Sequence, residues 1–207
     1  TPLKTKFIEG GAGFMALVIA CLILGLALCI ERILYLGFSK TNTKKLLVKL
    51  EEALKNGGVA AATDVCRNTR GPVASIFTQA LLRLADGQSL EEVEKSVVSY
   101  GGVEASKMEQ NLSWISLFIA IAPSLGFLGT VIGMIQAFDA IMVAGDMSPA
   151  VVAGGMKVAL ITTVGGLIVA VILQIFYNYI LSQVEALTVE MEDASISLMD
   201  ILVKYQK

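Results

Sequence analysis

The sequence predicts an all-α membrane protein with three transmembrane helices, long cytoplasmic helical extensions, an outside N-terminus and a cytoplasmic C-terminus. Hydrophobic residues make up 55% of the 207 residues and charged residues only 16%, whereas a soluble domain carries about 25% charged residues. Three separate uncharged runs are each long enough to cross the hydrocarbon core, which takes about 20 residues. Lys and Arg are concentrated between the first two runs, which predicts the orientation.

The boundaries of the three spans follow from the charged residues that interrupt the apolar runs. Residues 10–30 carry no charge, and Glu31 and Arg32 end the first run. The uncharged runs 110–138 and 158–184 exceed what a core of about 30 Å requires at about 1.5 Å per residue, so we expect both helices to tilt or project. The predicted segments are 1–9 (periplasmic N-terminus), 10–32 (span one), 33–109 (cytoplasmic helical region), 110–142 (span two), 143–153 (short periplasmic link), 154–184 (span three) and 185–207 (cytoplasmic C-terminal helix).

The region 33–109 is predicted to consist of several helices on the cytoplasmic side. The link between spans two and three contains no Lys or Arg, whereas four lysines follow span one: Lys40, Lys44, Lys45 and Lys49. The sequence signals for helix starts are Thr41 or Asn42, Pro72 at a first helical position, and Ser89 with Glu92 as a capping box. The expected helix ends are residues 56–58 and 86–87, and a short helix is expected over 59–67.

The C-terminal stretch carries a heptad of apolar residues. Its members are Val184, Leu187, Met191, Ala194, Leu198, Ile201 and Tyr205. This spacing is typical of a coiled-coil seam between subunits. It is also typical of a helix that packs on its own cytoplasmic region. Under either interpretation, the third span is expected to continue as one long helix.

Composition excludes several functions. There is no histidine, and the three cysteines lack the spacing of a zinc site, so no metal or cofactor is expected. The net charge of −2 does not suit a nucleic-acid-binding protein. Buried acids and nucleophile motifs are also absent, so the chain is not expected to be an enzyme.

Spans two and three each carry a stripe of small residues. In span two the stripe is Gly126, Thr130, Gly133 and Ala137, with Pro123 and Gly129 close by. In span three it is Gly155, Ala159, Thr162, Gly166 and Ala170, with Thr163 adjacent. Small residues allow helix backbones to approach closely within one subunit. Because both stripes contain a mid-span threonine, they also favour a shared pore or a groove for a partner helix.

Two motifs resemble those of the ExbB/TolQ family of proton channels. Residues 123–138, PSLGFLGTVIGMIQAF, resemble the second-span signature of that family. Residues 155–169, with Ala-Leu-Ile-Thr-Thr at 159–163, resemble its third-span motif, and 71–73 resemble part of its cytoplasmic loop. The predicted topology is similar as well, and the resemblance is greatest to ExbB.

The resemblance implies a pentamer in the bacterial inner membrane around a dimer of a single-span partner similar to ExbD or TolR. It implies a pore-forming stator subunit whose proton flow energises a TonB-like client of outer-membrane transport. A TolQ-like role in envelope integrity, a gliding or secretion motor, and a non-conducting membrane scaffold remain as alternatives. Membrane lipid is an expected partner, and nucleic acid is not.

The resemblance also identifies candidate residues for a proton path. Thr130 and Thr163 match the pore threonines of the family, and Thr162 is a weaker candidate. The charges expected at the outer mouth of the pore are Lys157, Asp139 and Asp146. The third span departs from the family pattern, because Val158 stands where many members have a glutamate. No Asp, Glu, Lys or Arg lies inside the three runs, so the partner must supply the carboxylate that binds the proton.

Overall fold

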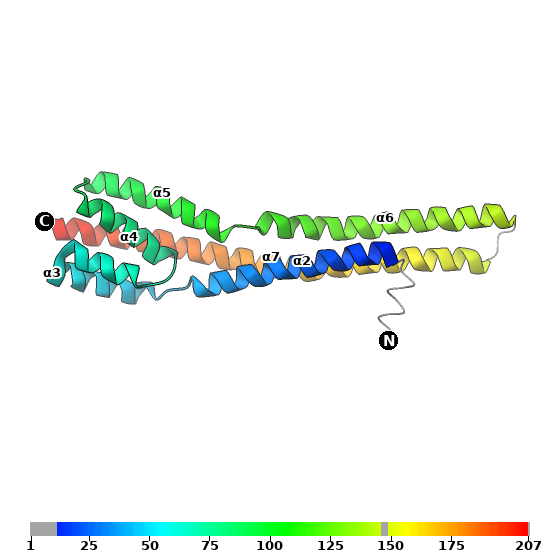
Figure 1. Ribbon diagram of the computed structural model, residues 1–207, viewed down its shortest axis with the longest axis horizontal. Coiled ribbons are helices and arrows are strands. Elements are labelled where there is room, and N and C mark those ends of the chain that lie inside the picture. Colours follow the sequence, from blue (N-terminus) through cyan, green and yellow to red (C-terminus); the bar gives the residue numbers. More distant parts are fainter. Residues whose placement is uncertain (1–11, 146–148, 207) are drawn as a thin grey trace. The chain divides into compact units, whose positions relative to one another are not determined.

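The computed structural model describes residues 12–145 and 149–206, and every regular element in these two ranges is an α-helix. The helices are α2 (Ala12–Phe38), α3 (Thr43–Arg67), α4 (Pro72–Ala85), α5 (Leu90–Met108), α6 (Leu112–Ala144) and α7 (Pro149–Gln206), as Figure 1 shows. Within the described part of the chain, three helical segments are long and apolar enough to cross a membrane: Gly13–Phe38 in α2, Leu90–Val143 over α5 and α6, and Val152–Gln206 in α7. The predicted segment 1–9 lies outside the described residues.

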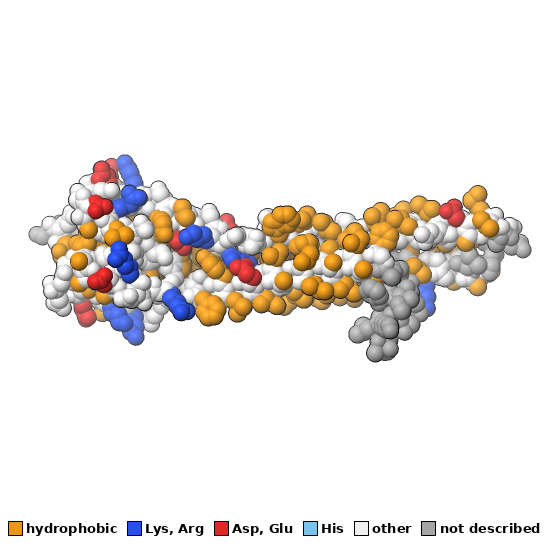
Figure 2. All heavy atoms as spheres, viewed as in Figure 1, with side chains coloured by type: hydrophobic (Ala, Val, Ile, Leu, Met, Phe, Trp, Pro, Cys, Tyr) orange, Lys and Arg blue, Asp and Glu red, His pale blue; other side chains and the backbone are white. Residues whose placement is uncertain are grey.

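The chain forms two compact units. The apolar unit comprises Thr1–Glu31 and Asn111–Tyr179, and the polar unit comprises Arg32–Gln110 and Ile180–Lys207. Figure 2 shows hydrophobic side chains over the visible face of the first unit, whereas Lys, Arg, Asp and Glu gather mostly over the second. The division corresponds to the predicted contrast between apolar spans and charged helices.

In the apolar unit, large hydrophobic side chains lie on the outside of all three helices. They include Leu17, Ile23, Leu24, Phe127, Ile135, Ile168, Val171 and Ile175, each of which is more than half exposed. A helix that is apolar all round is either buried in a large protein or surrounded by lipid. Because these side chains are exposed in the chain, lipid or neighbouring membrane helices must cover them.

The polar unit has a core of its own around α4. Side chains of α3, α4 and α7 are fully buried there, and they include Leu50, Ile76, Phe77, Leu81, Leu198 and Leu202. The short helix α4 packs against both α3 and α5. Its buried residues recur at the spacing of an amphipathic helix, which explains why its apolar face was visible in the sequence.

Local signals in the sequence placed the helix starts of the polar unit correctly. The Asn42 side chain accepts a hydrogen bond from the Lys45 backbone N–H, and Pro72 lies in the first turn of α4. Ser89 and Glu92 form both bonds of the capping box. The expected break near residue 58 is a kink inside α3, where Gly58 has φ 74°. Only glycine adopts that conformation readily.

The predicted heptad packs inside the polar unit. Val184, Leu187, Met191, Ala194 and Leu198 are all buried within the chain. Packing on the chain's own helices therefore explains these residues, rather than a seam between subunits. The heptad is wrong at its end, because Tyr205 is 44% exposed and Leu202 is buried instead. A step of four from residue 198 to 202 follows the ordinary α-helical period of 3.6 rather than the coiled-coil period of 3.5.

Arg32, which the sequence placed at the end of span one, is a buried residue of the polar unit. It is 2% exposed, and its guanidinium donates hydrogen bonds to the carbonyl oxygens of Lys107 (2.7 Å) and Met108 (3.3 Å). The guanidinium also lies 4.4 Å from the ring centroid of Tyr35. These carbonyls are in the last turn of α5, where a cation interacts favourably with the helix dipole. Nearby, the Glu104 carboxylate raises the pKa of Lys107.

Replacing Arg32 with methionine should destabilise the polar unit by about 2 kcal/mol, because the two carbonyls lose a buried, charged donor. The measurement is the thermal midpoint of the purified chain. An Arg32→Lys variant should lose less, since an ammonium keeps the charge but not the planar donor geometry. An Arg32→Met chain as stable as the parent would show that these bonds do not hold the end of α5.

Candidate functional site

The two small-residue stripes face each other across the contact between α6 and α7. A methyl group at Gly126 would lie 3.0 Å from the Thr162 carbonyl oxygen and 3.2 Å from the Thr163 Cα. At Gly166 a methyl group would lie 2.5 Å from the carbonyl oxygen of Ala122. Glycine at these positions lets one backbone touch the other.

Further along the pair, the contacts show that the two helices run antiparallel. Gly133 lies against Ala159, and Gly155 lies against Ala137. Residues later in α6 therefore contact residues earlier in α7. Of the remaining stripe residues, Gly129 packs against Thr162, while Pro123 and Ala170 are half-buried. That the same stripe also faces a pore stays a prediction.

The hydroxyl groups of Thr130 and Thr163 meet at the centre of this contact. The two oxygens contact each other directly. The Thr130 hydroxyl also lies 3.1 Å from the Gly126 carbonyl oxygen and 3.0 Å from that of Ala159. The Thr163 hydroxyl lies 3.3 Å from the Ala159 oxygen and 3.4 Å from that of Gly126. Each hydroxyl thus has the other hydroxyl, one carbonyl of its own helix and one of the facing helix within reach.

Thr162 has a different environment. Its side chain is buried, its hydroxyl donates to the Val158 carbonyl oxygen at 3.1 Å, and its methyl group lies beside Gly129. Thr130 and Thr163 are only half-buried, so one side of their pair is open in the isolated chain. The geometry therefore separates the Thr130–Thr163 pair from Thr162, which fills the contact between the helices.

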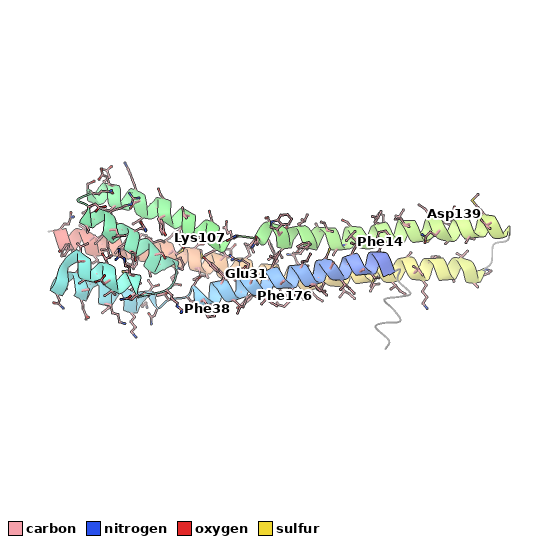
Figure 3. All side chains as sticks on the ribbon, in the orientation of Figure 1. Phe14, Glu31, Phe38, Lys107, Asp139 and Phe176 are labelled. Atoms are coloured by element: carbon pink, nitrogen blue, oxygen red, sulfur yellow. The ribbon has the colours of Figure 1, made fainter. Side chains whose placement is uncertain are left out.

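Two of the charges predicted for the outer mouth, Asp139 and Lys157, lie toward the C-terminal end of α6 and the N-terminal end of α7. Asp139 is exposed near the C-terminal end of α6, as Figure 3 shows. Lys157 is exposed in the early turns of α7. Asp146 lies outside the described residues. Val158, in place of the glutamate common in the resembled family, is half-buried and presents only an apolar side chain.

The site holds polar groups that do not titrate near neutral pH. Residues 112–138 of α6 and 158–179 of α7 contain no Asp, Glu, Lys, Arg or His. Among the described residues, no cluster of His, Cys, Asp and Glu could hold a metal ion. A threonine hydroxyl can donate one hydrogen bond and accept others, but it cannot store a proton. The arrangement can orient water or a carboxyl group.

Two α2 residues that sequence reasoning missed also pack against the site. Phe14 lies beside Gly129, and Met15 lies beside Gly165. The adjacent glycines 165 and 166 therefore serve different neighbours, with Gly165 facing α2 and Gly166 facing α6. The pair of glycines was the only signal for this in the sequence, because two adjacent helical residues point about 100° apart.

Comparisons with known proteins connect this geometry to a family. Residues 68–193 match the MotA/TolQ/ExbB proton channel family. A protein of Methanothermobacter thermautotrophicus named as a biopolymer transport protein ExbB homolog is 34% identical over 87% of this chain. A Synechocystis protein named as biopolymer transport protein ExbB-like 3 is 26% identical over 75% of this chain and 74% of its own length. The biopolymer transport protein ExbB of Helicobacter pylori is 29% identical over 55% of this chain and 85% of its own length.

The chain spans 63% of the length of the Methanothermobacter relative. The family match covers more than half of the chain and includes all of α6 and the residues of α7 that carry Thr163. With three helices that are apolar and long enough to cross a bilayer, the protein is a multi-pass membrane protein. The chain belongs to the MotA/TolQ/ExbB proton channel family.

Proposed function

We propose that this chain is the pore-forming stator subunit of a motor driven by the proton-motive force, most similar to ExbB. Copies of the chain surround a dimer of a single-span partner of the ExbD/TolR kind, in a pentamer in the inner membrane. The observation that carries the proposal is the Thr130–Thr163 hydroxyl pair, which lies in a membrane contact without any titratable side chain.

The two hydroxyl groups can exchange the roles of hydrogen-bond donor and acceptor. Each hydroxyl has a single proton, so when Thr130 donates to Thr163, Thr163 donates to a carbonyl oxygen, and the order can reverse. Such a pair can solvate a carboxylic acid or a water molecule at either stage. The group that gains and loses the proton is a carboxylate of the partner helix, because the uncharged runs 10–30, 110–138 and 158–184 of this chain contain none.

The work that proton flow drives is the energisation of TonB-type transport across the outer membrane. Three relatives of the chain are named for biopolymer transport. The orientation that suits this role has the polar unit in the cytoplasm and the link between α6 and α7 outside. The many basic residues of 32–110 support that orientation.

The test is proton flux in liposomes that hold a pH gradient. We expect the purified chain alone to leak no more than empty vesicles, and the chain co-purified with its single-span partner to conduct. Replacing the mid-span carboxylate of the partner with its amide should stop conduction. Sustained leak through the chain alone would place the titrating group on this chain, and a complex that never conducts would make it a scaffold.

A further inference from the structure

A groove runs between α5 and α7 in the polar unit. Its volume is about 660 Å³, and its floor contains the buried residues Ile76, Val97 and Met191. Val98 on one wall is 72% exposed and Ile196 on the other is 63% exposed. Gly101, Gly102 and Ala105 also line the groove, and their small size leaves it open on the α5 side. An apolar groove with exposed walls in an otherwise polar unit is a candidate docking site.

The rim of this groove is acidic. Glu94 projects from α5, and Glu192 and Asp200 project from α7. All three are exposed, and no Lys or Arg is among the described residues that line the groove. An occupant that fits must therefore present a small apolar side chain among basic ones.

The outer face of α3 in the same unit has that composition. Val48 is 56% exposed, and the exposed residues Lys44, Lys45 and Lys49 lie near it, with the exposed Glu52 one turn further along α3. The first turn of α3 contains no acidic residue. Lysines at a helix N-terminus interact unfavourably with the helix dipole, so the local fold of α3 does not explain them.

The two surfaces lie at the same level along the helix axes, because α3 and α7 run parallel to each other within the polar unit. Near the start of α3 the Thr43 hydroxyl donates to a Glu190 carboxylate oxygen at 2.5 Å. At Gly58 a methyl group would lie 3.8 Å from the Tyr205 hydroxyl. The same number of residues separates these two positions in each helix. Lys45 is therefore level with Glu192, and Val48 is level with the residue before Ile196.

The two surfaces lie on different sides of α7. At about 100° per residue, Glu190 and Tyr205 point within about 60° of each other, toward α3. The α7 residues of the groove, such as Thr188, Glu192 and Met199, point about 180° from Glu190. Figure 1 shows the C-terminal part of α7 between α3 and α5 in this unit. One chain therefore cannot place its own α3 face in its own groove, whereas a neighbouring copy can.

We propose that the acidic α5–α7 groove of one copy receives the basic α3 face of the next copy. Copies that span one membrane in the same orientation present each residue at the same height, so Val48 meets Ile196 and Lys45 meets Glu192. Such a head-to-tail contact uses two different surfaces, which is the geometry that closes a ring. The inference rests on the homo-oligomer of the proposed function and assigns its contact surfaces.

Disulfide cross-linking in native membranes tests this contact. A chain with both Val48→Cys and Ile196→Cys should form a ladder of covalent oligomers on oxidation. The background should be low, because Cys21, Cys29 and Cys66 are buried and burial raises the pKa of the Cys66 thiol to about 12. A Val48→Cys and Val103→Cys chain is the matched control, since Val103 lines a different groove and should give no ladder.

Mixing singly substituted chains shows which surfaces meet. Differently tagged Val48→Cys and Ile196→Cys copies, expressed together, should yield dimers that always contain one chain of each kind. Either variant expressed alone should stay monomeric on the denaturing gel. Dimers of one variant with itself would show a two-fold contact and overturn the proposal, as would the absence of any cross-link.

Charge reversal and groove filling test the chemistry of the contact. Lys45→Glu should lower the cross-link yield about fivefold, and adding Glu192→Lys should restore it. Gly102→Leu should also abolish the link, because no atom lies within 4 Å of a methyl group there and the side chain can fill the groove. Val103→Leu is its control and should have no effect.

The outcomes separate this contact from the proposed function. If cross-links are absent while the complex still conducts protons, the stator function stands and the contact is wrong. If the links form in a complex that does not conduct, the contact stands and the proton function is wrong. If Gly102→Leu releases the single-span partner and no 48–196 link forms, the groove binds that partner, and the proposal is overturned.

Discussion

Replacing Gly166 with alanine should push α7 away from α6 and lower the thermal midpoint of the purified chain by about 4–8 °C. A methyl group there would lie 2.5 Å from the Ala122 carbonyl oxygen and 3.3 Å from the Gly126 Cα. Both are backbone atoms, so no side-chain rotation can relieve the overlap. Overpacking costs about 1–3 kcal/mol and more against rigid atoms, while alanine regains up to about 1 kcal/mol of helix propensity. We expect a net loss of about 2 kcal/mol.

Two other glycines in the same helices provide controls for this variant. At Gly154 a methyl group meets no atom within 4 Å, so Gly154→Ala should leave the midpoint unchanged or raise it. At Gly133 a methyl group would lie 3.4 Å from the Ala159 Cβ, which is an ordinary contact, so Gly133→Ala should change little. If the thermal midpoint of the Gly166→Ala chain equals that of these controls, α6 and α7 are not in contact at Gly166.

The parts of the fold that could be predicted are those that depend on neighbouring residues. Capping by Asn42 and by Ser89 with Glu92 uses side chains within one turn, and the sequence contains all of that information. The apolar spans were equally visible, because a bilayer selects for length and for absence of charge. The kink at Gly58 could also be expected, because two adjacent glycines are a local signal for the end of a helix.

The parts that could not be predicted depend on which helices meet. The heptad of α7 was compatible with two partners, and the burial of its residues from Val184 to Leu198 within the chain showed that the helix packs on the chain itself. Arg32 was expected to end a membrane span. Its hydrogen bonds to the end of α5 join residues more than seventy positions apart, and no local signal reveals them.

The candidate site was predictable as a set of residues but not as a geometry. Sequence resemblance matched Thr130 and Thr163 to the pore threonines of the family and left Thr162 as a weaker candidate. Whether Thr163 or Thr162 reaches Thr130 depends on the rotation of α7 about its axis, and the contacts of Gly126 and Gly166 set that rotation. The hydroxyl of Thr162 donates along its own helix instead. The packing thus distinguishes two threonines that are adjacent in the sequence.

Replacing both Thr130 and Thr163 with valine should lower proton flux through the assembled complex at least about tenfold, equivalent to about 1.4 kcal/mol on the barrier. Valine keeps the shape of threonine and removes the hydroxyl, so the contact between α6 and α7 should persist. A hydrogen bond between membrane helices contributes about 0.6 kcal/mol on average, which is too little to disrupt the assembly. The measurements are flux in liposomes and the native mass of the complex.

Three variants show whether the hydroxyls act by position or by packing. Thr130→Ser and Thr163→Ser keep the donor and should retain most of the flux. Thr162→Val removes a hydroxyl that donates to the Val158 carbonyl oxygen of its own helix and not to Thr130, and it should change flux little. A double valine variant that conducts like the parent would exclude the pair from the proton path. Loss of flux together with loss of assembly would give the pair a structural role instead.

The pH dependence of the remaining flux identifies which group binds the proton. Hydroxyl groups do not titrate near neutral pH, so the valine variants should lower the maximum rate. The pH at which flux is half-maximal should stay within a few tenths of a unit, because under the proposed function that midpoint belongs to a carboxylate of the partner. A large shift would mean that the hydroxyls of Thr130 and Thr163 stabilise one protonation state of that carboxylate strongly. The pair would then set its affinity for protons, as well as the rate at which protons pass.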